Sequence, residues 1–241
     1  MIRFDSFFSA ADAARSESTL ARLGVTGKDW VLTGGFAIEI HLARLGAPNL
    51  CRPLHDIDFL CSAFADIPEA LAETFWLRHV HPDDGPGKTL VQAFDPNTGV
   101  RVDVFRAYGA VMERAVQADF PFGPVAMIAA ADLTARAARL SWDICEGKPV
   151  PFKYVRDFLR LADCLPAAAV AAVWPDHRKA TQPPSFADAA AQIRQSSTTH
   201  PERFVDLVYS RDVAETCPRC RDWGSLRRTD AQRILDLAGY C

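Results

Sequence analysis

The sequence predicts an α+β protein, with a small mixed β-sheet and flanking helices followed by a helical C-terminal part. Three observations support this class. Short apolar segments of strand length alternate with helical patterns in the first half of the chain. Two of these segments, 89–94 and 100–105, are separated by five turn-forming residues, which is typical of a β-hairpin. After about residue 118 the chain becomes rich in alanine, which favours helices.

The elements of the first half follow from the apolar spacing and from the residues that end each segment. Helices are expected at 6–24, 35–45 and 66–75, and strands at 30–33, 56–61, 89–94 and 100–105. Gly24 and Gly46 are the predicted ends of the first two helices, because glycine readily adopts the left-handed conformation found there. The connection 95–99, Asp-Pro-Asn-Thr-Gly, has the composition of a turn.

In the second half of the chain, the sequence pattern predicts helices and no strands. They are expected at 127–146 and 151–165, within the alanine-rich segment 166–195, which breaks near Pro183-Pro184, and at 230–238. We therefore divide the chain into a mixed α/β core at 1–118, a helical domain at 119–195 and a C-terminal extension at 196–241.

Composition excludes several classes of protein. The 241 residues are 49% hydrophobic and 24% charged, which is ordinary for a globular protein. A formal charge of −3 argues against binding nucleic acid over the whole surface. The chain has no apolar run of eighteen residues and no apolar signal segment near Met1, so we expect a cytoplasmic protein without a membrane partner.

Two aspartates dominate the strand at 56–61. Asp56 and Asp58 are two residues apart, so they project from the same face with Cα atoms roughly 6–7 Å apart. The strand is otherwise apolar, and two such carboxylates repel each other unless a cation lies between them. With Asp103 on a later strand, they could hold two Mg²⁺ ions about 3.5–4 Å apart. The alternative is an outward-facing pair without a ligand.

A glycine pair precedes these carboxylates. Thr33-Gly34-Gly35 joins a predicted strand to a predicted helix. Glycine lets the backbone approach a phosphate, and a helix N-terminus offers free N–H groups to an anion. Thr33 could add a hydroxyl. A plain tight turn is the alternative interpretation, since the spacing matches neither a Walker loop nor a dinucleotide fingerprint.

Together, Gly34-Gly35-Phe36-Ala37, Asp56-Ile57-Asp58-Phe59 and Val102-Asp103-Val104 resemble the signature of the polymerase-beta-like nucleotidyltransferase superfamily. The order and spacing match over roughly residues 28–108. The Gly-Gly-x-Ala form, with Arg52 shortly before the acid pair, looks most like the small bacterial branch. That branch includes aminoglycoside nucleotidyltransferases and toxin-like, abortive-infection nucleotidyltransferases.

The resemblance implies transfer of a nucleoside monophosphate from ATP or another NTP to an acceptor hydroxyl, with release of pyrophosphate. It implies that Asp56, Asp58 and Asp103 bind Mg²⁺, that Asp103 is able to act as a general base, and that Gly34 and Gly35 hold the triphosphate. The acceptor, whether a small molecule, a tRNA or a protein, and any regulatory partner protein stay open.

The resemblance extends to Lys153 and Asp157 in the helix at 151–165. Their i,i+4 spacing puts them on one helix face, where Lys153 could reach a phosphate and Asp157 could orient it; Arg156 is a further candidate. A solvated lysine is the alternative. His55 departs from the family pattern, and we interpret it as structural, like His41.

The seven cysteines pose a separate question. Cys217 and Cys220 have the Cys-x₂-Cys spacing of half a zinc site, which Cys241 and His200 could complete. Free thiols or a redox pair are the alternatives. Arg219, Arg221, Arg227, Arg228 and Arg233 make this segment basic, so it is either a phosphate-binding or a solvated surface.

Two other functions stay open. A nucleotidyltransferase-like fold could bind NTP as a regulatory module without turnover. A two-metal phosphohydrolase would use similar carboxylates, but such sites usually recruit clustered histidines. The six histidines of this chain do not cluster around Asp56 or Asp103 in the sequence.

Overall fold

The computed structural model describes residues 7–24, 29–47, 51, 53–54, 56–63, 67, 71–79 and 90–206. Its centre is a mixed sheet in the order β3-β4-β5-β2-β1-β7-β6. The strands are β1 (Trp30–Thr33), β2 (Asp56–Cys61), β3 (Trp76–His79), β4 (Leu90–Phe94), β5 (Arg101–Arg106), β6 (Val116–Phe120) and β7 (Gly123–Met127). The pairs β2–β5 and β1–β7 are parallel, and the other neighbours are antiparallel. The predicted α+β class is confirmed.

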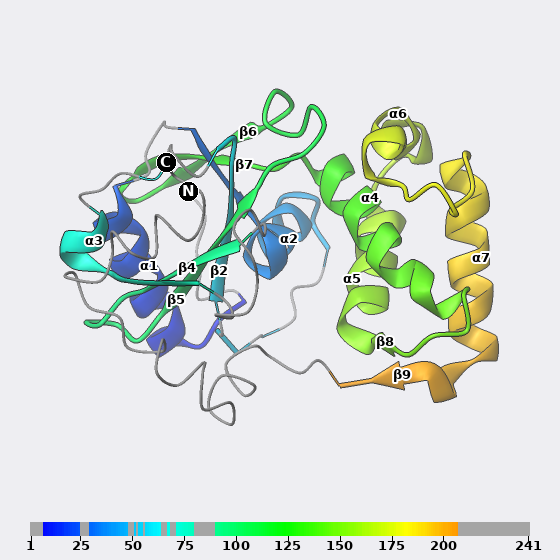
Figure 1. Cartoon of the computed structure of the whole chain (residues 1–241), viewed down its shortest axis with the longest axis horizontal. Helices are drawn as coiled ribbons and strands as arrows, with labels where there is room; N and C mark the ends of the chain where they lie inside the picture. Colours follow the sequence, from blue (N-terminus) through cyan, green and yellow to red (C-terminus); the bar gives the residue numbers. More distant parts are fainter. Residues whose placement is uncertain are drawn as a thin grey trace.

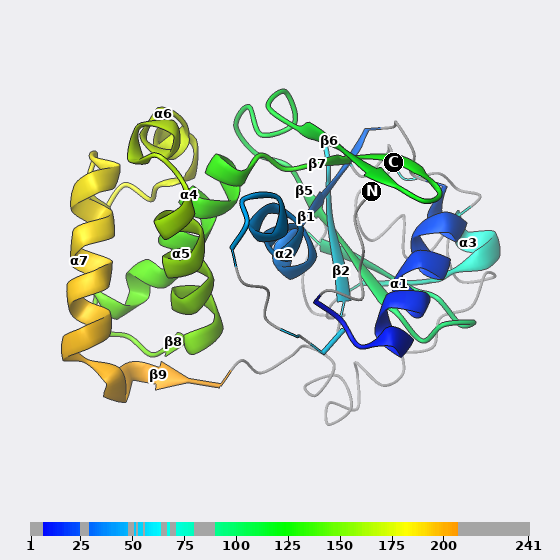
Figure 2. The same ribbon diagram turned by 180° about the vertical axis from the view of Figure 1, so that it is seen from behind.

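Two helices cover opposite faces of this sheet (Figure 1; Figure 2). Helix α1 (Ala10–Leu23) begins at the capping side chain of Ser9, which accepts a hydrogen bond from the Asp12 amide, and ends at Gly24. Helix α2 (Gly34–Arg44) follows β1 directly and lies between the sheet and the helical part of the molecule. The short helix α3 (Leu71–Thr74) precedes β3.

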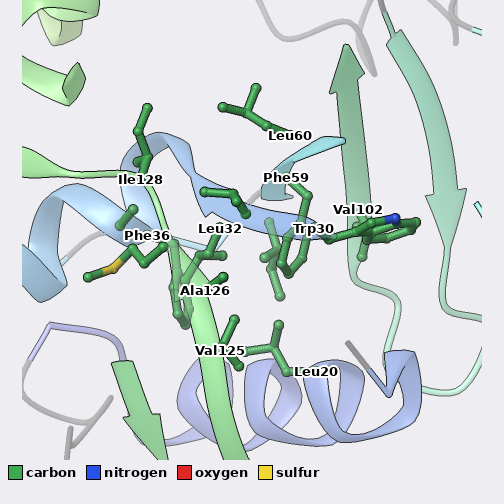
Figure 3. Close-up of a cluster of buried hydrophobic side chains, with 14 of the residues drawn as sticks. Leu20, Trp30, Leu32, Phe36, Phe59, Leu60, Val102, Val125, Ala126 and Ile128 are labelled. Carbon is green, nitrogen blue, oxygen red and sulfur yellow. The ribbon is translucent and has the colours of Figure 1, made fainter. Parts of the chain in front are cut away.

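The main core lies in and around this sheet. Trp30 and Phe59 come from adjacent strands and pack with ring centroids 5.6 Å apart, and Leu20 reaches the same cluster from α1 (Figure 3). The face of β2 that carries Ile57 and Phe59 is completely buried. Because side chains alternate along a strand, Asp56 and Asp58 project from the other face.

The helical part has its own core. It contains α4 (Ala130–Ser141), α5 (Phe152–Cys164), α6 (Ala167–His177) and α7 (Phe186–Thr199). Two 3₁₀ turns, η3 (Trp142–Ile144) and η4 (Pro201–Arg203), and a two-stranded sheet of β8 (Val150–Pro151) and β9 (Phe204–Val205) complete it. Trp174 and Phe158 are fully buried in this second core, and Phe186 packs edge-on against both.

A buried polar network joins the two parts, and we call it the Asp132 network. Arg114, from the segment after β5, donates two hydrogen bonds to the Asp132 carboxylate of α4, at 2.6 and 3.0 Å. The imidazole of His177 in α6 bridges Asp132 Oδ1 (2.8 Å) and the Tyr108 hydroxyl (3.0 Å). Arg114 also pairs with Asp176 at 2.8 Å. Every acid in this network therefore contacts a cationic or hydrogen-bonding side chain.

Most predicted elements are confirmed, including the hairpin of β4 and β5 and the break between α6 and α7. The helix expected from residue 127 is wrong at its start, because Met127 is the last residue of β7 and pairs with Leu32. The strands β3, β6 and β7 were not predicted. The domain division at residue 118 stays a prediction, although the sheet itself continues to Met127.

Some predicted features lie outside the described residues. They are the C-terminal helix at 230–238 and residues 66 and 68–70 of the helix expected at 66–75. Among the described helices, none has the length and apolar character needed to cross a membrane.

Candidate active site

A row of polar side chains crosses the middle of the sheet. Strand register aligns Thr33 of β1 with Asp58 of β2, Asp58 with Asp103 of β5, and Asp103 with Gln92 of β4. Register partners project from the same face, so the four side chains form one line. Gln92 is buried, and its amide donates a hydrogen bond to the Asp103 carboxylate. This amide therefore helps to position Asp103.

Two residues earlier on strands β2 and β5, and on the same face, Asp56 is aligned with Arg101. Arg101 is two residues before Asp103 and thus shares its face. Its guanidinium contacts Asp56 Oδ2 through Nη2, and its Nε lies 2.9 Å from Asp103 Oδ1. Arg101 is thus an ion-pair partner of two of the three predicted metal ligands.

The three aspartates meet as predicted. One carboxylate oxygen from each of Asp56, Asp58 and Asp103 lies within 4.8 Å of the others. Three converging carboxylate oxygens form a hard donor set of the kind that suits Mg²⁺. The residues therefore fit a divalent cation.

Glycine at position 34 is required by this cluster. Gly34 has φ +68°, a conformation that side chains rarely adopt. A Cβ atom there would lie 1.7 Å from Asp58 Oδ2, so the carboxylate rests directly on the backbone at the start of α2. The interpretation of Gly34-Gly35 as a plain turn misses this close approach.

The carboxylates are held in an electrostatically unfavourable arrangement. Burial, together with the charges of Asp56 and Asp103, raises the pKa of Asp58 well above its ordinary value. Burial also raises the pKa of Asp103 to about 6, despite the opposing effect of Arg101. Both shifts favour the neutral carboxylic acids, so uptake of protons or of a cation stabilises this cluster.

Helices α4 and α5 form the wall opposite the carboxylates. A cavity of about 230 Å³ separates them from the sheet. It is lined by Gly34, Gly35, Ile38, Asp56, Asp58, Asp103, Phe105, Leu133, Arg136, Ala137, Leu140, Lys153, Tyr154 and Asp157. Lys153 and Asp157, predicted from the family resemblance and their i,i+4 spacing, therefore line the same cavity as the three aspartates. Arg156 is not among the lining residues, and its Nε lies 3.7 Å from Asp157.

Arg136 was missed in the sequence. It lies on α4, where its Nη1 is 3.5 Å from Thr33 Oγ1 and its guanidinium lies 5.4 Å from the centre of the Phe105 ring. Thr33 is fully buried and contacts this arginine rather than lining the cavity. An arginine within an alanine-rich helix carries no motif, so only the packing of α4 against the sheet reveals it.

An ion pair fixes the two walls relative to each other. Glu39 of α2 is fully buried and accepts two hydrogen bonds from Arg160 of α5, at 2.6 and 2.9 Å. The helix that begins at Gly34 is thereby joined to the helix that carries Lys153.

Two other candidate residues, His41 and His200, are described and do not belong to this cluster. His41 is buried, and its Nε2 lies 2.7 Å from the Ile128 carbonyl oxygen, which agrees with a packing role. Burial lowers the pKa of His41, so the neutral ring donates this hydrogen bond. The remaining candidates lie outside the described residues: Arg52, His55, Cys217, Cys220, Cys241 and the arginines at 219–233. His200 contacts Glu202 on the surface.

Comparison with known proteins adds little. No protein-family model matches the chain, and no curated protein matches its sequence. Among solved structures, an antigenic nucleotidyltransferase-like protein from Paracoccidioides brasiliensis is similar over 83% of this chain and 93% of that chain, with 13% identity and a TM-score of 0.36. A likeness at this level indicates no function.

Proposed function

We propose that this protein is a Mg²⁺-dependent nucleotidyltransferase that moves a nucleoside monophosphate from an NTP to an acceptor hydroxyl. One observation carries the proposal. Three carboxylates, a close backbone approach at Gly34 and two cationic side chains, Arg136 and Lys153, surround a single cavity. Carboxylates alone would suit many metal sites, whereas the facing cations provide for a polyphosphate.

In this proposal Asp56 and Asp58 hold Mg²⁺ and Asp103 completes its ligand set. Bound Mg²⁺ polarises the phosphoryl group and offsets charge on the departing pyrophosphate. Gln92 keeps Asp103 oriented, while the main chain at Gly34 leaves space for Asp58. Arg136 and Lys153 bind the triphosphate from the opposite wall, and Asp157 orients Lys153.

The proton of the acceptor hydroxyl needs a base. Asp103 suits this role because its pKa of about 6 is closer to neutrality than that of an ordinary aspartate. The acceptor oxygen forms a bond to the α-phosphorus as the bond to the β-phosphate oxygen breaks. The proton passes to Asp103, and the electron pair of the broken bond leaves with pyrophosphate.

The apolar part of the cavity supplies a surface for the nucleoside. Leu133 and Leu140 from α4, Ile38 from α2 and the aromatic ring of Tyr154 all line it. The acceptor stays open among a small molecule, a tRNA and a protein side chain. We also propose that the protein belongs to the toxin-like branch, that a partner protein regulates it and that it is cytoplasmic.

The test is transfer of label from NTPs labelled at the α-phosphate, with Mg²⁺ and three acceptor pools: aminoglycosides, total tRNA and soluble protein. We expect transfer to one pool, lost in Asp56→Ala and Asp58→Ala and kept in Asp119→Ala, which changes an exposed aspartate of β6. Release of inorganic phosphate would instead indicate hydrolysis. NTP binding without transfer would favour the regulatory module.

A further inference from the structure

We propose that Arg101 takes the place of one of the two metal ions expected from the sequence, so that the carboxylate cluster holds one divalent ion. This inference rests on the proposed function, because it concerns how the same site binds metal. It changes the expected composition of the site from two metals to one metal and one guanidinium.

The position of Arg101 carries the argument. Parallel pairing of β2 and β5 puts Arg101 directly opposite Asp56, and strand alternation puts it on the same face as Asp103. Its guanidinium contacts both carboxylates, at Asp56 Oδ2 and Asp103 Oδ1. A second ion shared by these two ligands would need the space that the guanidinium occupies.

Because Arg101 is buried, displacing its guanidinium from the two carboxylates is energetically costly. The Arg101 side chain is only 11% exposed, and its guanidinium contacts two carboxylates. A buried guanidinium that loses its carboxylate partners is strongly destabilising unless other groups replace them. Metal entry therefore favours a position near Asp58 over displacement of Arg101.

Charge balance agrees with one ion. Three carboxylates, one guanidinium and one divalent ion sum to zero formal charge. A second ion would leave two positive charges in excess before the nucleotide binds. The negative charge of a bound triphosphate is already faced by Arg136 and Lys153 across the cavity.

The test counts Mn²⁺, as a substitute for Mg²⁺, bound per chain in the presence of a non-hydrolysable NTP analogue. Electron paramagnetic resonance adds a second readout, because two Mn²⁺ ions about 4 Å apart couple magnetically. We expect one uncoupled ion in the unaltered protein and in Arg101→Lys, which keeps the charge. Arg101→Gln should bind two coupled ions.

Arg106→Gln is the matched control, because Arg106 is an exposed residue on the same strand. It should bind one ion. Two ions in the unaltered protein, or one in a folded Arg101→Gln, would overturn the role of Arg101 and leave the proposed function standing. No bound ion in the unaltered protein would overturn both. If Arg101→Gln does not fold, the counts in the unaltered protein and in Arg101→Lys decide.

Discussion

The two buried acid clusters of this protein are built in opposite ways. In the Asp132 network, one carboxylate accepts two hydrogen bonds from Arg114 and lies 2.8 Å from His177 Nε2. In the candidate active site, three carboxylates lie together, and Arg101 is in direct contact with two of them, Asp56 and Asp103. The first cluster is balanced by the protein itself, whereas the second keeps negative charge in excess.

The pKa values express the same difference. Burial would raise the pKa of Asp132, but the hydrogen bonds from His177 and Arg114 outweigh burial and lower it. At the other cluster, burial and like charges raise the pKa values of Asp58 and Asp103. Excess buried charge of this kind is costly unless a ligand compensates it, and it therefore distinguishes a binding site from a structural network.

The largest expected effect is on catalysis at the unbalanced cluster. Asp58→Asn should lower kcat/KM at least about a thousandfold, equivalent to about 4 kcal/mol, because it removes a metal ligand. The same change should leave the metal-free protein equally stable or more stable, since it relieves repulsion among carboxylates. Transfer kinetics and urea unfolding measure the two effects. A large loss of stability would contradict the distinction between the clusters.

The balanced cluster should respond in the reverse sense. Asp132→Ala should destabilise the protein by about 3 kcal/mol, because it leaves the buried side of Arg114 and His177 without a carboxylate. Metal binding by the fraction that remains folded should be unchanged. Urea unfolding and Mn²⁺ titration test this, with Asp119→Ala as the control. Loss of Mn²⁺ binding from a folded variant would show that the network belongs to the site.

A smaller effect, on NTP affinity, is expected for the cationic side chains of α4 and α5 that face the carboxylates. Lys153→Met should weaken NTP binding about tenfold, or about 1.4 kcal/mol, because it removes one charge that faces the triphosphate. Lys148→Met is the matched control, because Lys148 is exposed and pairs with Glu146. Calorimetric titration with a non-hydrolysable NTP measures both. Equal affinities in the two variants would place Lys153 outside the binding site.

The smallest effect concerns pH. The folded-state pKa of Asp103 is raised to about 6, so the folded protein binds a proton more readily than the unfolded chain between about pH 4 and 6. The metal-free protein should therefore gain stability on the order of 1 kcal/mol as the pH falls from 7 to 5. Asp103→Asn should lose this part of the change, as followed by urea unfolding at each pH.

The Asp132 network should change the stability of the protein with pH in the opposite direction. Its lowered pKa means that its contribution is present above about pH 4 and is lost only as the pH falls further. In Asp132→Ala, the change in stability between pH 7 and 5 should therefore keep the part that depends on Asp103. If that part disappears, the two clusters are coupled and the comparison fails.

The sequence predicted the parts of the site that depend on local spacing. Alternation along a strand was enough to put Asp56 and Asp58 on one face. Helical spacing put Lys153 and Asp157 on one helix face, although the family resemblance was needed to single them out. Strand alternation also puts Arg101 on the same face as Asp103. No motif predicts a basic residue among metal ligands, so Arg101 was not among the predicted site residues. Residues brought in by packing between distant elements were beyond such patterns, as Arg136 shows.

The fold was predictable to a similar extent. Apolar strands bounded by turn residues, such as Trp30–Thr33, were identified correctly. The hairpin of β6 and β7 was missed because its second strand contains Gly123 and Pro124, which local patterns assign to loops. Pairing of Leu32 with Met127 overrides the helical preference of the alanine-rich segment that follows.

The most direct measurement of the central claim follows both ends of the triphosphate at once. An NTP labelled differently at the α- and γ-phosphates is incubated with the protein, Mg²⁺ and the acceptor pools, and both labels are traced. We expect α-label on the acceptor and γ-label in pyrophosphate in equal amounts, with neither product in Asp58→Asn. Appearance of the γ-label as inorganic phosphate, or equal turnover in Asp58→Asn, would contradict it.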